Sequence, residues 1–570
     1  MTERAGRDAG GGPDPSPRAA LAAALALTLV LCLPFVGKAF HIDDPAFLNL
    51  SGMIGWNPLH AMPVDYDFGG GVIPQLLPYE ITHPLLVPYF IKIVRAAFGE
   101  SEIALHLAFL VFPVIALASL VALSATLFPG TGWLRLVLAA FFATLPAFLV
   151  NAQNVMTDVP AVAFLLLAMM GFVRGIDQNA PRMLWLGSAA LTLAIFTSYQ
   201  MGIFVPLVLL YALACRRATA ATVAAALLPL LVLAAWLAAV YALYDIFPVL
   251  KSKLADSQAS IGGELRKGLT PLLMLHRGVS VLAFVGATLL WVLPLHYALQ
   301  GRLVRRGLLR YVLLLAVSYP LTLAVVRYPP GSRLALAAFV AAGLLGCFTL
   351  VETAVAGAKR RGESAREVFL LAWIGCVVGY CVFLLPFSAA RYPLPAYPAM
   401  LILLLGDPAW SVATRGRRVA VGLALCGSAI LALLSAYSDS RFAGTYREFA
   451  QTVAELRATR PAGSTVWFIG EWGMHHYMER AGARYLHADS TAPARGDLVV
   501  IPEMPRFWAP SPEVRSRMVP AGSRRYASAL PLRLFNARSR AGFYAQFIGM
   551  LPFAFSSQPD EVFQIYEVVR

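Results

Sequence analysis

Apolar runs about as long as a bilayer is thick recur along most of this 570-residue chain. Hydrophobic residues make up 59% of the sequence and charged residues 14%, against about 45–50% and about 25% in soluble domains. A soluble fold has no means of burying that much apolar surface. The pattern therefore predicts a mainly α protein, a polytopic bundle of membrane helices whose backbone hydrogen bonds are satisfied internally.

A window of about 20 mostly apolar residues gives about thirteen spans. They lie at residues 19–37, 102–128, 134–150, 158–174, 184–199, 201–215, 219–244, 278–299, 311–326, 334–352, 367–387, 394–412 and 418–437. The pair at 184–215 is short enough to form one re-entrant element instead. The first run exceeds the usual apolar length of a signal peptide and is interpreted as an uncleaved helix, preceded by a disordered cytoplasmic segment, residues 1–18.

Basic residues gather in alternate loops between these runs, which predicts that those loops are cytoplasmic. They are Arg18; Arg135; Arg174 and Arg182; Arg216 and Arg217; Arg302, Arg305, Arg306 and Arg310; Lys359, Arg360 and Arg361; Arg415, Arg417 and Arg418. The segment 38–101 and the tail 438–570 are then expected on the external side of an inner (plasma) membrane. Because the net charge of +15 lies mostly in these loops, contacts with membrane lipids are expected and nucleic-acid binding is not.

The tail after residue 437 differs in character from the rest of the chain. "STVWFIG" (464–470), "ARYLHAD" (483–489) and "GDLVVIP" (496–502) have the composition of strands, and "EWGMHHYMERAG" (471–482) that of a helix closed by glycine. The sequence therefore predicts a transmembrane domain over 19–437, with an external loop at 38–101, followed by a small extracytoplasmic α/β domain over 438–570.

Acidic residues stand at the external ends of two predicted spans. Asp43 and Asp44 follow the first span in "FHIDDPAFLNL", and Asp158 precedes another in "NAQNVMTDVPA". Carboxylates are costly in a bilayer and mark functional sites there, so two such sites on one face are candidates for a shared cavity. The alternative is that Asp43 caps a helix and Asp158 is a first-turn acid favoured by the helix dipole.

Several motifs in their order resemble those of GT-C-fold glycosyltransferases, the group of protein O-mannosyltransferases and lipid A aminoarabinose transferases. The pair Asp43-Asp44 stands where that family commonly has Asp-Glu. It is followed by "THPLLVPYFIKIVRAAFGES" (82–101), by "NAQNVMTDVPA" (151–161) and by "SAARYPLPAYPAM" (388–400). The resemblance extends over nearly the whole chain and implies a GT-C-like fold.

The resemblance implies a donor in which a sugar is linked to a polyprenyl phosphate and an acceptor hydroxyl on a protein, lipid or envelope glycan. An inverting displacement of this kind is helped by a base that removes the hydroxyl proton. We expect Asp43 to be that base, with Asp44 supporting it and Asp158 completing the acidic site.

The leaving phosphate needs cations, and a guanidinium matches phosphate oxygens in pairs. Arg391, beside Tyr392, is the first candidate, with His83 assisting; Lys251 and Lys253, in the basic loop 245–277, are expected to fold over the donor phosphate. Each has an alternative: Arg391 extending to lipid headgroups, His83 making a structural hydrogen bond, and a loop that is merely solvated.

No motif requires a cofactor, and the use of a divalent metal stays an open alternative. His475 and His476 lack a third ligand at helical spacing and are interpreted as helix surface. A transporter or flippase of lipid-linked sugars is the competing function, although transporters place ionisable groups near the bilayer midplane. A non-catalytic envelope scaffold would leave the facing acids unexplained.

Overall fold

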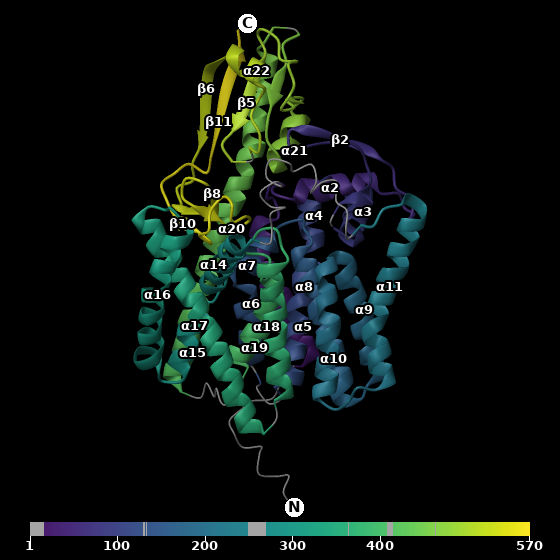
Figure 1. Ribbon diagram of the computed structural model, residues 1–570, viewed down its shortest axis with the longest axis vertical. Helices are drawn as coiled ribbons and strands as arrows, with labels where there is room; N and C mark the ends of the chain where they lie inside the picture. Colours follow the sequence, from purple (N-terminus) through teal and green to yellow (C-terminus); the bar gives the residue numbers. More distant parts are fainter. Residues whose placement is uncertain are drawn as a thin grey trace, which may run out of the picture.

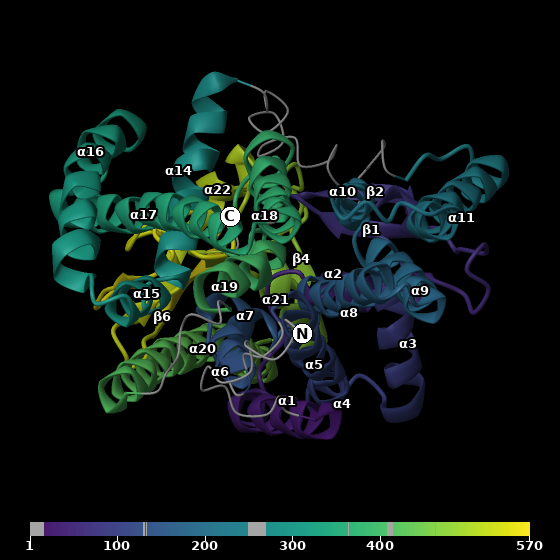
Figure 2. The same cartoon turned by 90° about the horizontal axis from the view of Figure 1, so that it is seen from below.

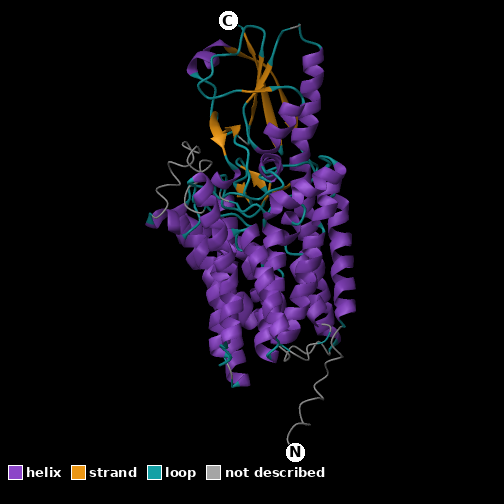
Figure 3. Ribbon diagram, turned by 90° about the vertical axis from the view of Figure 1, so that its right-hand side faces the viewer, coloured by secondary structure: helices purple, strands orange, loops and turns teal. Residues whose placement is uncertain are grey.

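A computed structural model describes residues 16–81, 83–128, 132, 134–248, 270–362, 364–406, 414–461, 463–504 and 506–569. Long helices stand side by side in a bundle, and the strands of the C-terminal region gather at one end of it (Figures 1 and 3). The predicted fold class, a mainly α membrane bundle followed by a small region of strands and helices, is confirmed.

Nine helices in the described part of the chain are long and apolar enough to cross a membrane. They are α1 (Pro17–Cys32, continued by η1, Leu33–Phe35), α4 with α5 (Glu102–Phe109, Val111–Leu127), α8 (Asp158–Gln178), α11 (Ala220–Tyr244), α14 (Pro271–Thr288), α16 (Leu309–Val325, preceded by η4, Leu303–Leu308), α17 (Pro330–Arg361), α18 (Ala365–Phe383) and α20 (Arg415–Ala458). Viewed along the bundle, α16 and α17 lie on the side opposite α9 (Pro181–Thr197) and α11 (Figure 2).

The other predicted spans are helical but short, so the count of thirteen is not confirmed. They correspond to α6 (Leu134–Ala143) with α7 (Pro146–Asn151), α9, η3 (Tyr199–Ile203) with α10 (Phe204–Ala214), and η5 (Leu394–Ala396) with α19 (Tyr397–Leu405). Extended backbone at Leu145 separates α6 from α7, whose first residue is Pro146, as expected of the residue before a proline. All nine residues of α19 are buried, as is typical of a helix that is apolar all round.

Helix α20 connects the bundle to the tail. Its 44 residues span about 66 Å at 1.5 Å per residue, roughly twice the thickness of a hydrocarbon core. The predicted domain boundary at 437/438 lies inside this helix. Its C-terminal part packs against α21 (Trp472–Arg480) and β7 (Leu532–Arg533) of the tail, so the tail is held close to the end of the bundle.

The segment after the first span lies at that same end (Figure 1). It forms α2 (Asp44–Met53), β1 (Val64–Phe68), β2 (Gly71–Leu76), η2 (Pro78–Glu80) and α3 (Leu86–Phe98). The turn between β1 and β2 touches the tail, where the Gly70 N–H donates to the Tyr485 hydroxyl at 3.0 Å. Gly70 has a φ of +84°, and a Cβ there would lie 2.7 Å from the Trp508 ring. Only glycine fits this turn.

The tail contains a five-stranded sheet in the order β4-β3-β5-β11-β6. Strands β3 (Val466–Phe468), β4 (Arg484–Tyr485) and β5 (Leu498–Pro502) and helix α21 coincide with the four predicted elements. Strands β3, β4 and β5 run parallel, and β11 (Glu561–Val568) pairs antiparallel with β5 and with β6 (Met518–Tyr526). The remaining elements are α22 (Pro512–Arg517) and the short strands β8 (Phe535–Asn536), β9 (Ala541–Gly542) and β10 (Ala554–Phe555), and α15 (Val292–Leu299) completes the bundle.

Candidate active site

Three charged side chains from distant parts of the sequence meet beside the tail. The guanidinium of Arg391 lies 2.7 Å from Asp43 Oδ2 and 3.9 Å from Asp158 Oδ2. The two carboxylates therefore share one cation, and the site combines two negative charges with one positive charge.

Local backbone structure explains why both carboxylates are available. Asp43 occupies the N-cap position of α2 but makes no capping hydrogen bond, so its carboxylate is turned toward Arg391 instead. Asp158 is the first residue of α8, where the helix dipole favours a negative charge. The interpretation of Asp158 as a first-turn acid thus holds together with its place in the site.

Arg391 lies in the turn between α18 and η5 and is enclosed by the protein. Its side chain is 9% exposed, whereas Asp43 is 33% and Asp158 14% exposed. Burial opposes its charge, but the nearby Asp43 and Asp158 raise the pKa of Arg391 well above its usual value. The guanidinium also lies 5.4 Å from the centre of the Tyr392 ring. Arg391 is therefore a fixed internal cation and not a side chain extended to lipid headgroups.

His83 lies close to the same pair. Its ring is 5.2 Å from that of Phe47, and burial lowers the pKa of His83 to about 4, with the charges of Asp43 and Arg391 acting in opposite directions. His83 is consequently neutral at physiological pH. It can donate a hydrogen bond to a phosphate oxygen but adds no positive charge.

Asp44 has a different position from its neighbour. It is 0% exposed, and its two oxygens accept hydrogen bonds from the backbone N–H groups of His41 (3.1 Å) and Val155 (2.8 Å). Burial raises the pKa of Asp44 to about 7. Asp44 joins the turn before α2 to the turn before α8, and so holds the segments that carry Asp43 and Asp158 together.

A second buried polar cluster, which the sequence analysis missed, lies next to this turn. Lys38 donates hydrogen bonds to Asp439 and Asn154, and His41 Nε2 lies 3.2 Å from Asp439 Oδ2. The Tyr544 hydroxyl donates to the same oxygen at 2.8 Å. We call these five side chains the Lys38–Asp439 cluster. The available signal was that Lys38 and Asp439 each stand within two residues of the end of an apolar run, on the side predicted to be external.

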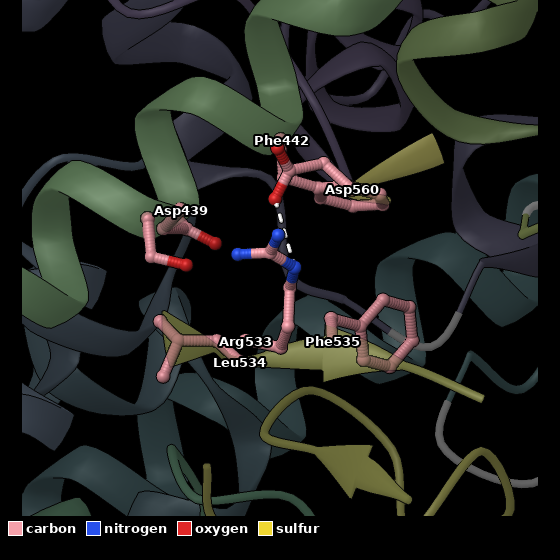
Figure 4. A pocket seen from close by; sticks show the side chains of 7 residues that line it. Asp439, Phe442, Arg533, Leu534, Phe535 and Asp560 are labelled. Carbon is pink, nitrogen blue, oxygen red and sulfur yellow. Dashed lines mark ion pairs between the residues drawn. The ribbon is translucent and has the colours of Figure 1, made fainter. Parts of the chain in front are cut away.

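A small cavity of about 10 Å³, roughly the room that one water molecule needs, adjoins this cluster between α20 and the tail. Figure 4 shows the guanidinium of Arg533, from β7, directed toward Asp560 across this cavity; the Arg533 Nε lies 3.2 Å from Asp560 Oδ1. The cavity lining comprises Ser438, Asp439, Phe442, Arg533, Leu534, Phe535 and Asp560. Asp43 and Arg391 are not among them, so this cavity is separate from the candidate site.

The remaining predicted residues lie away from the Asp43–Arg391 pair or outside the described part of the chain. Lys251 and Lys253 lie outside the described residues. His475 is buried and not on the helix surface as the sequence predicted, and it pairs with Glu471 and Glu479 at 3.3 and 3.2 Å. In the described ranges no group of three or more His, Cys, Asp or Glu side chains is arranged to hold a metal ion. Asp43 and Asp158 share Arg391, so a divalent cation between them would compete with this guanidinium.

Comparison with known families bears on this arrangement. Residues 82–243 match the family model described as dolichyl-phosphate-mannose-protein mannosyltransferase. The predicted resemblance to this group of membrane glycosyltransferases is thereby confirmed for the segment that contains His83 and Asp158. A sequence search of the curated proteins gives no match.

Several solved structures are similar to this chain in a structural search. The oligosaccharyltransferase of Archaeoglobus fulgidus, tethered to an acceptor peptide, shares 14% identity at a TM-score of 0.46, over 82% of this chain and 63% of its own length. ArnT from Cupriavidus metallidurans bound to undecaprenyl phosphate shares 12% identity at a TM-score of 0.35, over 85% of this chain and 92% of its own length. The arabinofuranosyltransferase AftD from Mycobacteria shares 13% identity at a TM-score of 0.36, over 98% of this chain and 40% of its own length.

Proposed function

We propose that this multi-pass membrane protein is a glycosyltransferase that moves a sugar from a polyprenyl-phosphate donor to an acceptor hydroxyl. The observation that carries the proposal is the convergence of Asp43 and Asp158 on Arg391, at the end of the bundle beside the tail. The match of residues 82–243 to a mannosyltransferase family model supports the same reaction class.

Asp43 is the proposed general base. It is the most exposed of the three charged groups, so an acceptor hydroxyl can approach its carboxylate. The acceptor oxygen forms a bond to the anomeric carbon while the bond from that carbon to the phosphate oxygen breaks. The electron pair leaves with the lipid phosphate, the hydroxyl proton passes to Asp43, and the configuration at the anomeric carbon inverts.

Arg391 is the proposed contact for the donor phosphate, because a guanidinium binds phosphate oxygens in pairs. Its Nε–H has no partner among the described residues. The other nitrogens already face Asp43 and Asp158, so a phosphate would take over part of the guanidinium and release Asp43 toward the acceptor. Tyr392 supports the guanidinium face, His83 donates from the side, and Lys251 and Lys253 are proposed as further cations from the basic loop.

The site is proposed to face the outside of an inner (plasma) membrane, together with the tail. The arginine-rich loops supply the argument for this orientation. The acceptor is a protein, a lipid or an envelope glycan, each of which offers a hydroxyl at that surface.

Reconstitution into liposomes with a panel of labelled polyprenyl-phosphate sugars tests the proposal. We expect the label to appear in a new glycosidic bond on an envelope acceptor, with inverted anomeric configuration by NMR. Movement of intact labelled donor across the bilayer without bond formation would instead indicate a flippase and would overturn the proposal. Retained configuration would contradict a single displacement with Asp43 as base.

A further inference from the structure

Two backbone hydrogen bonds join the C-terminal tail to the loop that carries Arg391. The Ala390 N–H donates to the Phe543 carbonyl at 2.7 Å, and the Gln546 N–H donates to the Ser388 carbonyl at 2.9 Å. Ser388 and Ala390 are 0% and 2% exposed. Because Arg391 directly follows Ala390, the position of its guanidinium depends on this pairing with the tail.

Tyr544 lies in the sequence between the two tail residues that make these hydrogen bonds, and its side chain contacts further segments near the site. Its hydroxyl donates to Asp439 Oδ2 at 2.8 Å and accepts from Asn154 Nδ2 at 3.1 Å. Its ring meets that of His41 edge to face, with the ring centres 5.3 Å apart. Asn154 belongs to the turn before α8 and His41 to the turn before α2, so one side chain of the tail touches both turns that carry the carboxylates.

We propose that the tail segment 543–546 is a clamp, with Tyr544 as its positioning residue. The clamp fixes the Arg391 loop relative to the two acidic turns, which are the turns before α2 and α8 that carry Asp43 and Asp158. The tail is then part of the active centre and not only an appended domain. The consequence for catalysis rests on the proposed function, whereas the clamp itself is a property of the fold.

The polarity of the Lys38–Asp439 cluster explains why a tyrosine is suited to this position. Lys38 and Asp439 carry opposite charges, and burial lowers the pKa of His41 although the neighbouring Asp439 opposes this shift. A buried carboxylate is stable only when donors surround it. Tyr544 supplies one such donor, to the same carboxylate oxygen that Lys38 and His41 contact, and it ties the tail to the charge pair.

The substitution Tyr544→Phe separates this hydrogen bond from packing, because the ring contacts with His41, Phe535 and Phe543 are preserved. Tyr526→Phe is the matched control. Tyr526 is a half-buried tyrosine of the same tail that packs on Phe563 and contacts neither the Arg391 loop nor the acidic turns.

Hydrogen–deuterium exchange in lipid nanodiscs reads the clamp without any substrate. The reporters are two amides, Ala390 N–H, bonded to the tail, and His41 N–H, bonded to Asp44. In Tyr544→Phe we expect both to exchange about fivefold faster, the factor that corresponds to one lost hydrogen bond. Tyr526→Phe should leave both unchanged. Wild-type exchange at both amides in Tyr544→Phe would overturn the clamp.

Kinetics then test the positioning role. Tyr544→Phe should lower kcat about tenfold, because a small misplacement of reacting groups is costly, while KM for the lipid donor stays within about twofold. An unchanged kcat despite faster exchange would overturn the positioning role. A wild-type protein that transfers no sugar would remove the proposed function, but the exchange result would still decide whether the clamp exists.

Discussion

Arg391 and Asp43 are 348 positions apart in the sequence and form an ion pair of 2.7 Å at the end of the helical bundle. Neither residue lies within one of the membrane-spanning helices. Asp158, on the first turn of α8, faces the other side of the same guanidinium at 3.9 Å. The fold thereby brings three charges from distant parts of the chain together at the end of the bundle beside the tail.

Replacing Arg391 by lysine should remove most activity while preserving the fold. One ammonium keeps the positive charge but cannot face both carboxylates and a phosphate in the planar geometry of a guanidinium. We expect kcat to fall about 10²–10³-fold, as for loss of one group that stabilises a developing charge. Initial rates of sugar transfer check this, with Arg525→Lys on the exposed strand β6 as control; equal rates in both variants would exclude Arg391 from the reaction.

Removing only one partner of the Lys38–Asp439 pair should destabilise the folded protein. Both side chains are 0% exposed, and breaking a buried pair costs about 3–5 kcal/mol because a charge is left uncompensated. Lys38→Met should therefore lower the free energy of unfolding by that amount, and adding Asp439→Asn should recover part of the loss. Thermal unfolding in detergent measures both. Losses that simply add in the double variant would show that the two residues are not coupled.

Asp44 should make the stability of the protein depend on pH. Burial raises the pKa of Asp44 from 3.8 to about 7 in the folded state, so its stabilising contribution is complete below pH 3.8 and is lost as the pH rises through 7. The unfolding midpoint of wild type minus that of Asp44→Asn should thus be largest in acid and decline toward neutral pH. A difference that grew with pH would mean that Asp44 is buried as a carboxylate.

The sequence predicted the three charged residues of the site, Asp43, Asp158 and Arg391, because each stands at the end of an apolar run, where a charged side chain is costly and marks a functional site. It also anticipated the strands and helix at 464–502. It expected Asp44 to support Asp43 in the site but could not predict that Asp44 accepts hydrogen bonds from two backbone N–H groups, since the direction of each side chain depends on the tight turn at Ile42, whose φ is +52°.

The Lys38–Asp439 cluster could not be predicted from the sequence for a related reason. Lys38 and Asp439 are 401 positions apart, and their contact depends on how α20 is rotated against the first helix. Tyr544 comes from a tail region of two-residue strands, whose local pattern is too short to predict. The sequence also predicted a single span over residues 134–150, which the structure divides into α6 and α7, with Pro146 as the first residue of α7.

The transfer rate of Asp43→Asn is the most direct test of the account. Asparagine keeps the size of the side chain but cannot accept the acceptor proton, so transfer should fall by about 10³-fold or more, within the range attributed to a general base and its charge together. Asp65→Asn, on the exposed part of β1 in the same external segment, should transfer at the wild-type rate. A folded Asp43→Asn protein that transfers as fast as wild type would contradict the assignment of this site.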